Sequence, residues 1–270
     1  GLVVLAATLF AAGAAAGSAL AVGDGAGFFA FADLLAAGFA GAGLAGAAGL
    51  AGAGLPKSFS VLKKITPTPF LENGMSATEK KEKIEKLFTE IMETLGLDLT
   101  DDSLKETPHR VAKMYVDEIF YGLQTEKFPK ITIVDNKFDY DHAVVEVNIV
   151  TNSHCEHHFV PIIGKTHIAY VPNKKVLGLS KLNRIVDYFA KRPQIQERLT
   201  LQIHQALTII LETENVAVVV DAMHACVKTR GIKDVTSMTR TSKLSGVFKE
   251  DTSHRLEFMN TIPRAQEVIY

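Results

Sequence analysis

The sequence predicts an α+β fold built on a largely antiparallel sheet. Helical patterns come first along the chain, up to residue 122, and strand patterns follow between 145 and 172. A helix pair then spans 178–212, and strand patterns resume from 215 to 241. Because consecutive strands suggest hairpins, and because strands and helices do not alternate as they do in parallel sheets, we expect antiparallel pairing.

The first helix is predicted to begin after Ser76. Ser76 and Glu79 have the spacing of a capping box, and Gly96 ends the pattern. Apolar residues recur between them with helical spacing: Ile84, Leu87, Phe88, Ile91, Met92 and Leu95. A second helix is expected from Thr107 as N-cap, with Pro108 in its first turn, to Gly122.

Strands are predicted from alternation and from β-branched runs. Val145, Val147 and Ile149 alternate with polar residues, which is typical of a half-buried strand. The run 215–222 is almost entirely apolar, so we expect a buried strand there. Further strands are expected at 165–172, 224–229 and 234–241.

The helix pair lies between these strand groups. Pro193 separates its two members, and the second continues to about Glu212. The first member, 178–192, carries an apolar stripe formed by Leu182, Ile185, Val186 and Phe189. Helical character returns at 253–259. The apolar stripe gives the first helix of the pair a face that can pack on the sheet.

Composition divides the chain into three parts. Residues 1–54 hold 13 of the 20 glycines and no lysine or arginine, so we interpret them as a low-complexity extension. Prolines mark 55–75 as a linker, and 76–270 is the predicted domain. The uncharged run Leu2–Val22 is about as long as a membrane span. A weak membrane anchor and a targeting segment remain alternatives, although no basic residues flank the run.

Charge and cysteine content narrow the function classes. The chain has 270 residues with 29 Lys and Arg against 30 Asp and Glu, a net charge of -1. This balance argues against a general nucleic-acid binder. Two cysteines do not make a disulfide framework, so we expect a metal pair or catalytic thiols in a reducing, cytoplasmic compartment.

Both cysteines lie beside histidines, in "SHCEHHF" and "DAMHACVKTR". Cys155 and His158 form a close C-x2-H pair, and Cys226 can supply a distant third ligand. These residue types suit zinc, and three protein ligands leave the open fourth position of a catalytic site. The alternative is a buried free cysteine next to surface histidines, which would be preferred for one cysteine alone.

Two further histidines are candidates for proton transfer. His224 and Cys226 are two residues apart, so on a strand both side chains would face the same way. His157 adjoins the predicted ligand His158. Either imidazole can act as an acid or a base near neutral pH, although a packed or solvated histidine is the more common fate.

A group of basic and polar residues fits a nucleotide triphosphate. It comprises Ser180, Lys181, Arg184, Arg230, Arg110 and Lys113. Solvated helix faces are the alternative for each residue alone, and the chain has no P-loop motif. Gln196 and Glu197 could read the donor and acceptor edge of a purine. The simpler explanation is that both polar side chains lie at the surface and contact only solvent.

Four long segments resemble GTP cyclohydrolase I, the bacterial form most closely. They include "CEHHFVPIIGKTHIAYVP" (155–172) and "DAMHACVKTRGIKDVTSMTRT" (221–241), with similarity from about 76 to 260. The resemblance implies hydrolytic opening of the imidazole ring of GTP, release of formate and formation of 7,8-dihydroneopterin triphosphate for folate or pterin synthesis.

The resemblance also implies roles for particular residues. Zinc would be held by Cys155, His158 and Cys226, and protons moved by His157 and His224. Glu197, helped by Gln196, would hold the guanine. Ser180, Lys181, Arg184 and Arg230 would bind the triphosphate, with Arg110 and Lys113 supplied by a neighbouring subunit.

The fold that the resemblance implies is the tunnelling (T-) fold, assembled as a toroidal homodecamer with sites at subunit interfaces. Three other functions compete with this one. Another T-fold enzyme acting on a pterin or deazapurine would not be expected to carry both "CEHH" and "HACVKTRG". A zinc deaminase would require a P-C-x-x-C motif together with H-x-E, and this chain, with its two distant cysteines, has no P-C-x-x-C. A structural zinc protein would have a closed four-ligand site and no use for His157, His224 or Glu197.

Overall fold

The computed structural model describes residues 61–263. The predicted extension 1–54, with its apolar run Leu2–Val22, lies outside the described residues. Among the helices within 61–263, none is both long enough and apolar enough to cross a membrane.

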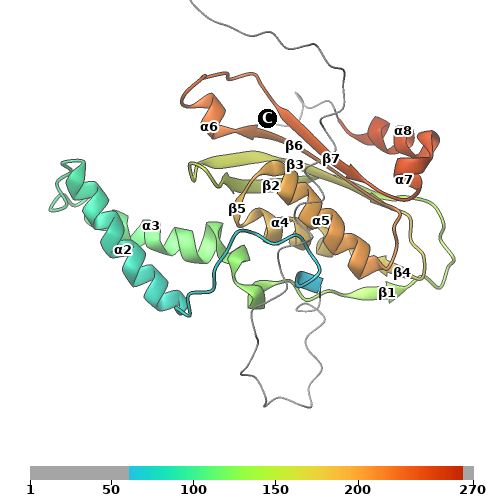
Figure 1. Ribbon diagram of the computed structural model, residues 1–270, viewed down its shortest axis with the longest axis horizontal. Coiled ribbons are helices and arrows are strands. Elements are labelled where there is room, and N and C mark those ends of the chain that lie inside the picture. The colour runs from blue at the N-terminus through green and yellow to red at the C-terminus, as the bar shows by residue number, and fades with distance from the viewer. Residues whose placement is uncertain (1–60, 264–270) are drawn as a thin grey trace, which may run out of the picture. The chain divides into compact units, whose positions relative to one another are not determined.

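A five-stranded sheet forms the centre of the fold (Figure 1). Its strand order is β5-β2-β3-β6-β7, and every neighbouring pair is antiparallel except β2 and β5. The strands are β2 (Val144–Cys155), β3 (Pro161–Tyr170), β5 (Pro193–Gln194), β6 (Val216–His224) and β7 (Thr239–Leu244). A small second sheet pairs β1 (Ile133–Asp135) with β4 (Lys175–Leu177). The predicted α+β class with a largely antiparallel sheet is confirmed.

The helix pair packs on one face of this sheet. It consists of α4 (Leu179–Ala190) and α5 (Gln196–Leu211), which contact β2 and β6 respectively. The predicted apolar stripe of the first helix is fully buried: Leu182, Ile185, Val186 and Phe189. Alternate residues of β6, such as Val218 and Val220, join the same core, because successive strand residues face opposite sides.

The other face of the sheet is covered near the C-terminus. Two short helices, α7 (Val247–Glu250) and α8 (Thr252–Thr261), place Phe248 and Phe258 against Ala217 and Val219. The second helix confirms the helical character predicted at 253–259. Both faces of β6 are therefore buried, which explains its continuous apolar sequence.

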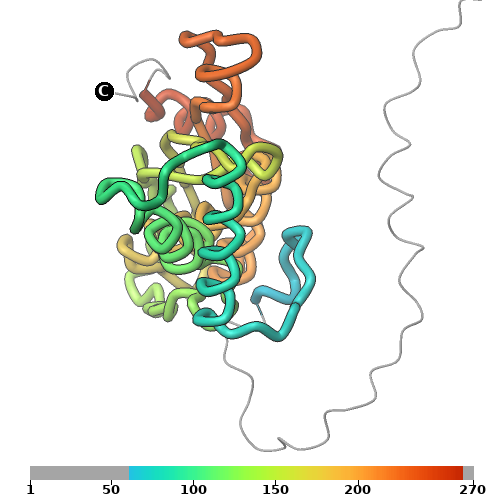
Figure 2. The backbone as a smooth tube through the Cα atoms, turned by 90° about the vertical axis from the view of Figure 1, so that its left-hand side faces the viewer, coloured from blue at the N-terminus to red at the C-terminus, as the bar shows by residue number. Residues whose placement is uncertain are grey.

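The described part of the predicted linker packs on this body. Val61 and Ile65 are buried in the core under the helix pair. The Thr66 N–H donates to Gln205 Oε1 at 2.8 Å, so this segment runs beside α5 (Figure 2).

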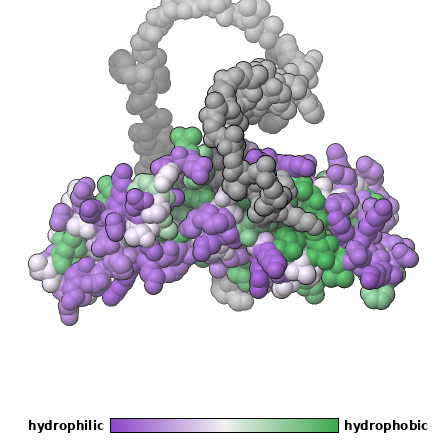
Figure 3. Space-filling view, turned by 90° about the horizontal axis from the view of Figure 1, so that it is seen from below, coloured by the Kyte–Doolittle hydropathy of each residue, from purple (hydrophilic) through white to green (hydrophobic). Residues whose placement is uncertain are grey.

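The N-terminal helices are α2 (Ala77–Thr94) and α3 (Thr107–Lys113). The capping box of Ser76 and Glu79 is present as predicted. The N-cap of α3 is Glu106 rather than Thr107, which lies inside the helix. Helix α2 packs on α3 but leaves much of its apolar stripe at the surface, where Leu87, Ile91 and Leu95 are 49%, 51% and 71% exposed. Apolar areas lie between polar ones at this end of the space-filling view (Figure 3).

The helix expected to continue to Gly122 does not do so. After Lys113 the chain forms a π-helix, η1 (Met114–Ile119), and two short 3-10 turns, η2 (Tyr121–Leu123) and η3 (Thr125–Lys127). Gly122 belongs to a tertiary contact, because its N–H donates to Lys191 O at 2.8 Å. A Cβ at Gly122 would lie 2.1 Å from Tyr188 O, so only glycine fits against the end of α4.

The alternation expected through Val145 and Ile149 is interrupted by a β-bulge. Pairing of β2 with β3 shifts between Glu146 and Ile149, and Asn148 has a φ of 64°. The extra residue moves Ile149 to the opposite face from Val145, into the core under the helix pair.

The strand expected at 224–229 is wrong. The segment forms a short helix, α6 (Ala225–Lys228), and the Thr229 N–H donates to Ala225 O. The physical reason is the lack of a partner strand: β7 begins at Thr239, later than the predicted 234, and its first residue pairs with Ala222. The β6 chain therefore leaves the sheet after His224.

Candidate active site and metal centre

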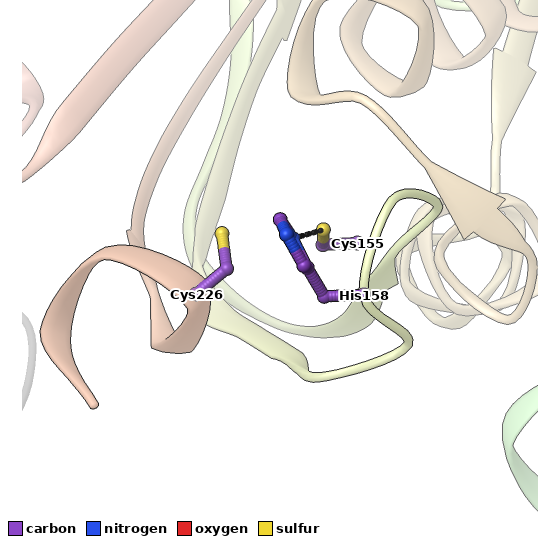
Figure 4. Close-up of side chains that lie close together, drawn as sticks. All are labelled: Cys155, His158 and Cys226. Atoms are coloured by element: carbon purple, nitrogen blue, oxygen red, sulfur yellow. Dashed lines mark hydrogen bonds between the residues drawn. The ribbon is translucent and has the colours of Figure 1, made fainter. Parts of the chain in front are cut away.

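Cys155, His158 and Cys226 come together, as the sequence predicts. Cys155 ends β2, His158 lies on the following turn, and Cys226 projects from α6 (Figure 4). Their ligand atoms all lie within 4.8 Å of one another. The Cys155 Sγ and His158 Nδ1 atoms are 3.6 Å apart.

This geometry fits a tetrahedral zinc ion. With Zn–S bonds of about 2.3 Å and Zn–N bonds of about 2.0 Å, sulfur and nitrogen ligands lie about 3.5 Å apart. The Cys155–His158 distance therefore needs little adjustment. Burial, followed by the adjacent Cys155 thiol, raises the pKa of Cys226. Two neighbouring thiolates require a compensating cation, which is what zinc provides.

A tight turn brings the first two ligands together. The Cys155 N–H donates to Val160 O at 2.9 Å, and the Phe159 N–H donates to Cys155 O at 2.8 Å. Phe159 has a φ of 54°, a left-handed conformation that is rare for a bulky residue. Its ring packs on Phe120 and Tyr115, which the π-helix and its end supply. The unpredicted π-helix thus supports the metal-binding turn.

Arg230 reaches the metal cluster from the segment after α6. Its Nη1 atom donates to His158 Nε2 at 2.8 Å, on the side of the ring away from Nδ1. With Nε2 accepting, a neutral ring carries its proton on Nδ1, the atom directed at Cys155 Sγ. A metal ion bound at Nδ1 would move that proton to Nε2 and displace the Arg230 contact. The predicted phosphate-binding residue Arg230 therefore lies at the metal site.

His224 contacts Gln196, not the metal ligands. The expectation that His224 and Cys226 share a strand face fails, because Cys226 lies on α6. The His224 Nε2 and Gln196 Oε1 atoms are 2.8 Å apart. Burial lowers the pKa of His224, while the charge of Glu197 opposes that shift.

Gln196 and Glu197 differ sharply in their environment. Gln196 is buried, and its Nε2 donates to Val220 O and to Thr239 O, both at 2.9 Å. Both amide protons are therefore used within the fold, and the amide does not present them to a purine. Glu197 is exposed and borders a surface cavity of about 300 Å³ between α5 and β7.

Sequence reasoning missed Glu156 and Arg198. Arg198 Nη1 donates to Glu156 Oε2 at 2.7 Å, and Nη2 donates to Oε1 at 3.1 Å. The hydrogen bonds from Arg198 hold the pKa of Glu156 below its usual range. His157 is 66% exposed, and its Nε2 lies 4.0 Å from Glu156 Oε1. Glu156 lies within a quoted motif and Arg198 within the predicted helix pair, but nothing in the sequence indicates that these two residues form a pair, because they are 42 positions apart.

Ser180, Lys181 and Arg184 are not brought to the metal ligands within one chain. They lie in the first turns of α4, where Asn183 donates to Glu146 near the start of β2. Cys155 ends β2 and pairs with Gln194, whose side chain bonds Phe189 O near the end of α4. The length of α4, about 18 Å, therefore separates Ser180, Lys181 and Arg184 from the Cys155 end of β2.

Arg110 and Lys113 also lie away from the metal ligands. Both are exposed on α3, five and two residues before Tyr115, whose ring packs on Phe159 next to His158. The structure therefore divides the predicted site residues between separate regions of one chain.

The amino-acid sequence was compared with protein families and with known proteins. The family model described as GTP cyclohydrolase I matches residues 84–263. A protein of Tolumonas auensis named GTP cyclohydrolase 1 is 56% identical over 193 residues, covering 72% of this chain and 89% of that protein. Proteins of the same name from Aeromonas salmonicida and Vibrio parahaemolyticus are 56% and 55% identical. These two matches cover 71% and 72% of this chain, and 88% and 89% of the relatives.

The motifs, the Cys–His–Cys cluster and the match over two thirds of the residues lead to one conclusion. The chain belongs to the GTP cyclohydrolase I family.

Proposed function

We propose that the chain catalyses zinc-dependent opening of the guanine imidazole ring of GTP. Formate leaves, and 7,8-dihydroneopterin triphosphate forms as the first product of folate or tetrahydropterin synthesis. The observation that carries the proposal is the convergence of Cys155, His158 and Cys226 from two distant segments of a chain in this family. The names of the relatives support GTP as substrate.

Cys155, His158 and Cys226 would hold the zinc ion. Zinc is a Lewis acid that makes hydroxide available at neutral pH, by lowering the pKa of water from about 16 to about 7. Three protein ligands leave a coordination position open, which favours a catalytic site over a structural one.

His224 and His157 would move protons during ring opening and the later rearrangement of the ribose. His224 is half-buried and hydrogen-bonded through Nε2, so its neutral ring offers Nδ1 as a proton acceptor. Its lowered pKa supports the neutral form at pH 7. His157 is exposed, and its Nε2 lies 4.0 Å from Glu156 Oε1, so its ring can exchange protons with solvent and substrate.

Glu197 would hold the guanine. Its carboxylate accepts from two parallel N–H groups, and the guanine edge offers N1–H and the 2-amino group. Gln196 would act at the same end of α5, although its amide protons are bound to backbone carbonyls. Arg230, Ser180, Lys181 and Arg184 would bind the triphosphate, and Arg110 and Lys113 would approach from a neighbouring subunit.

The division of the site between regions of one chain supports an oligomer. Ser180, Lys181 and Arg184 stand at the start of α4, while Cys155 pairs with Gln194 beyond the other end of α4, about 18 Å away. We infer that the α4 residues of one copy would serve the metal centre of another. The exposed apolar stripe of α2 provides surface that a second copy can bury. We therefore propose the T-fold and toroidal homodecamer that the family resemblance implies.

A turnover assay tests the proposed function. Purified protein is incubated with GTP, with and without zinc chelation, while formate and the fluorescent oxidised pterin are measured. Both products should form, both should be lost on chelation, and both should be lost in Cys226→Ala. Folded, zinc-loaded protein that makes neither product would overturn the proposal.

A second variant separates the enzyme from a structural zinc protein. His224→Ala should keep zinc and fold but lose turnover by about 100-fold or more, the usual contribution of a general acid or base. Product formation at the wild-type rate would favour the structural role.

A further inference from the structure

Glu156 and Arg198 form a paired contact between two parts of the site. The two guanidinium nitrogens of Arg198 meet the two carboxylate oxygens of Glu156 at 2.7 and 3.1 Å. The Arg198 side chain is only 11% exposed, and the Glu156 side chain is 26% exposed. A planar guanidinium that binds both oxygens fixes direction as well as distance, which a lysine contact does not.

The pair joins the metal-binding turn to the first turn of α5, which begins with Gln196 and Glu197. Glu156 stands directly after the ligand Cys155, and its N–H donates to Gln194 O at 3.0 Å. Arg198 follows Glu197 in the first turn of α5. The ion pair and the backbone bond therefore attach residue 156 to both sides of the β5–α5 junction.

The turn that follows Cys155 is only partly buried, so burial alone does not fix the position of His158. Cys155 is buried in the core, but His157, His158 and Phe159 are exposed. Phe159 is held in a left-handed conformation that the isolated chain disfavours. Contacts outside the turn must therefore keep His158 at ligand distance from Cys155.

We propose that Glu156 and Arg198 are positioning residues for the metal-binding turn. Arg198 holds the Glu156 carboxylate, and the carboxylate holds the turn in the geometry that zinc requires. Neither residue need touch substrate. The inference rests on the proposed function, because it assumes that Cys155, His158 and Cys226 bind zinc.

The alternative is an ion pair that contributes only to folding stability. The two roles differ in zinc affinity, because residues that orient metal ligands typically change it by about 10–100-fold. A pair that only supports the fold would lower the unfolding temperature of the zinc-free protein and leave the affinity of the folded protein unchanged.

The test measures zinc affinity of the full chain by competition with a chromogenic chelator. Arg198→Met removes the positive charge and both N–H donors. Arg198→Lys keeps the charge but not the two parallel N–H donors, and Glu156→Gln removes the negative charge while keeping the size of the side chain. We expect a 10–100-fold loss of affinity for Arg198→Met and a smaller loss for the other two. Thermal unfolding of each zinc-free variant shows whether it is folded.

Lys175→Met provides the control. It breaks an ion pair with Glu212, which links β4 to the C-terminal end of α5, the opposite end of that helix from Arg198. Its zinc affinity should equal that of the wild type.

The outcomes separate this inference from the proposed function. If the wild type binds no zinc, the proposed metal site is wrong and this inference falls with it. If the wild type binds zinc and folded Arg198→Met binds it equally well, the positioning role alone is overturned. If Arg198→Met does not fold, the positioning role is overturned when Arg198→Lys and Glu156→Gln both bind zinc as tightly as the wild type.

Discussion

The His224 Nε2 atom lies 2.8 Å from Gln196 Oε1, and the rest of Gln196 decides the direction of that hydrogen bond. The Gln196 amide nitrogen donates to two backbone carbonyls, Val220 O and Thr239 O, so the oxygen must face His224. An amide oxygen only accepts, and His224 must therefore carry its proton on Nε2. Its Nδ1 is then free to accept a proton when the ring is neutral.

Loss of this contact should lower the turnover number of the enzyme. In Gln196→Met we expect kcat to fall by about tenfold or more, because His224 no longer has a fixed tautomer. The KM for GTP should change by less than about threefold, since Gln196 has no free N–H group for the purine. Steady-state kinetics provide both values.

A control for this variant is Gln202→Met, another buried amide on α5. Gln202 donates to Thr66 O and lies six residues along α5 from Gln196, the partner of His224, so this variant reports the cost of losing a buried amide. An increase in KM with unchanged kcat in Gln196→Met would show that Gln196 binds guanine, as the sequence suggested.

Glu197→Gln should reduce recognition of the base. A charged carboxylate accepts two N–H bonds from guanine, whereas an amide accepts at one atom and presents a donor at the other. We expect kcat/KM for GTP to fall by about 30-fold or more. Inosine triphosphate lacks the 2-amino group, so the preference for GTP over this analogue should shrink in the variant. An unchanged preference would exclude Glu197 from base recognition.

Zinc affinity should rise with pH. Burial and the neighbouring Cys155 raise the pKa of Cys226, so near neutral pH this thiol is protonated in the metal-free protein. Zinc binds the thiolate and releases that proton, so this residue alone raises apparent affinity about tenfold for each pH unit. Chelator competition at several pH values measures the slope.

The variant Cys226→Ala should bind zinc more weakly and lose about one unit of that slope. An identical slope in variant and wild type would show that Cys226 is not a ligand.

His204 makes folding stability depend on pH at a place remote from the metal. Burial, helped by the charge of Lys243, lowers the pKa of His204 to about 4. Since the unfolded pKa is about 6.5, the unfolded state binds one more proton between these values. Stability is therefore full above pH 6.5 and falls by about 3 kcal/mol as the pH drops to 4.

The variant His204→Gln should flatten this dependence, because glutamine does not titrate. Urea unfolding at pH 7, 5.5 and 4.5 compares the two proteins, and the other titrating groups cancel in the difference. The prediction is wrong if the wild type and the variant lose stability in parallel.

The sequence by itself determined the element types wherever local chemistry governs them. The capping box of Ser76 and the apolar stripe of 178–192 predict their helices because both signals act within one helix. The apolar run at 215–222 likewise predicts a buried strand. The grouping of Cys155, His158 and Cys226 was also predicted from sequence, because few residue types bind zinc and this chain has only two cysteines.

Tertiary structure alone decided the remaining features. The strand expected at 224–229 became a helix because no partner strand reaches it, and the helix expected to reach Gly122 gave way to a π-helix and a contact with α4. The pairs Glu156–Arg198 and Gln196–His224 join distant segments, which no local pattern encodes. The separation of Ser180 from Cys155 has the same origin, because sheet register and helix direction place these residues only after the chain has folded.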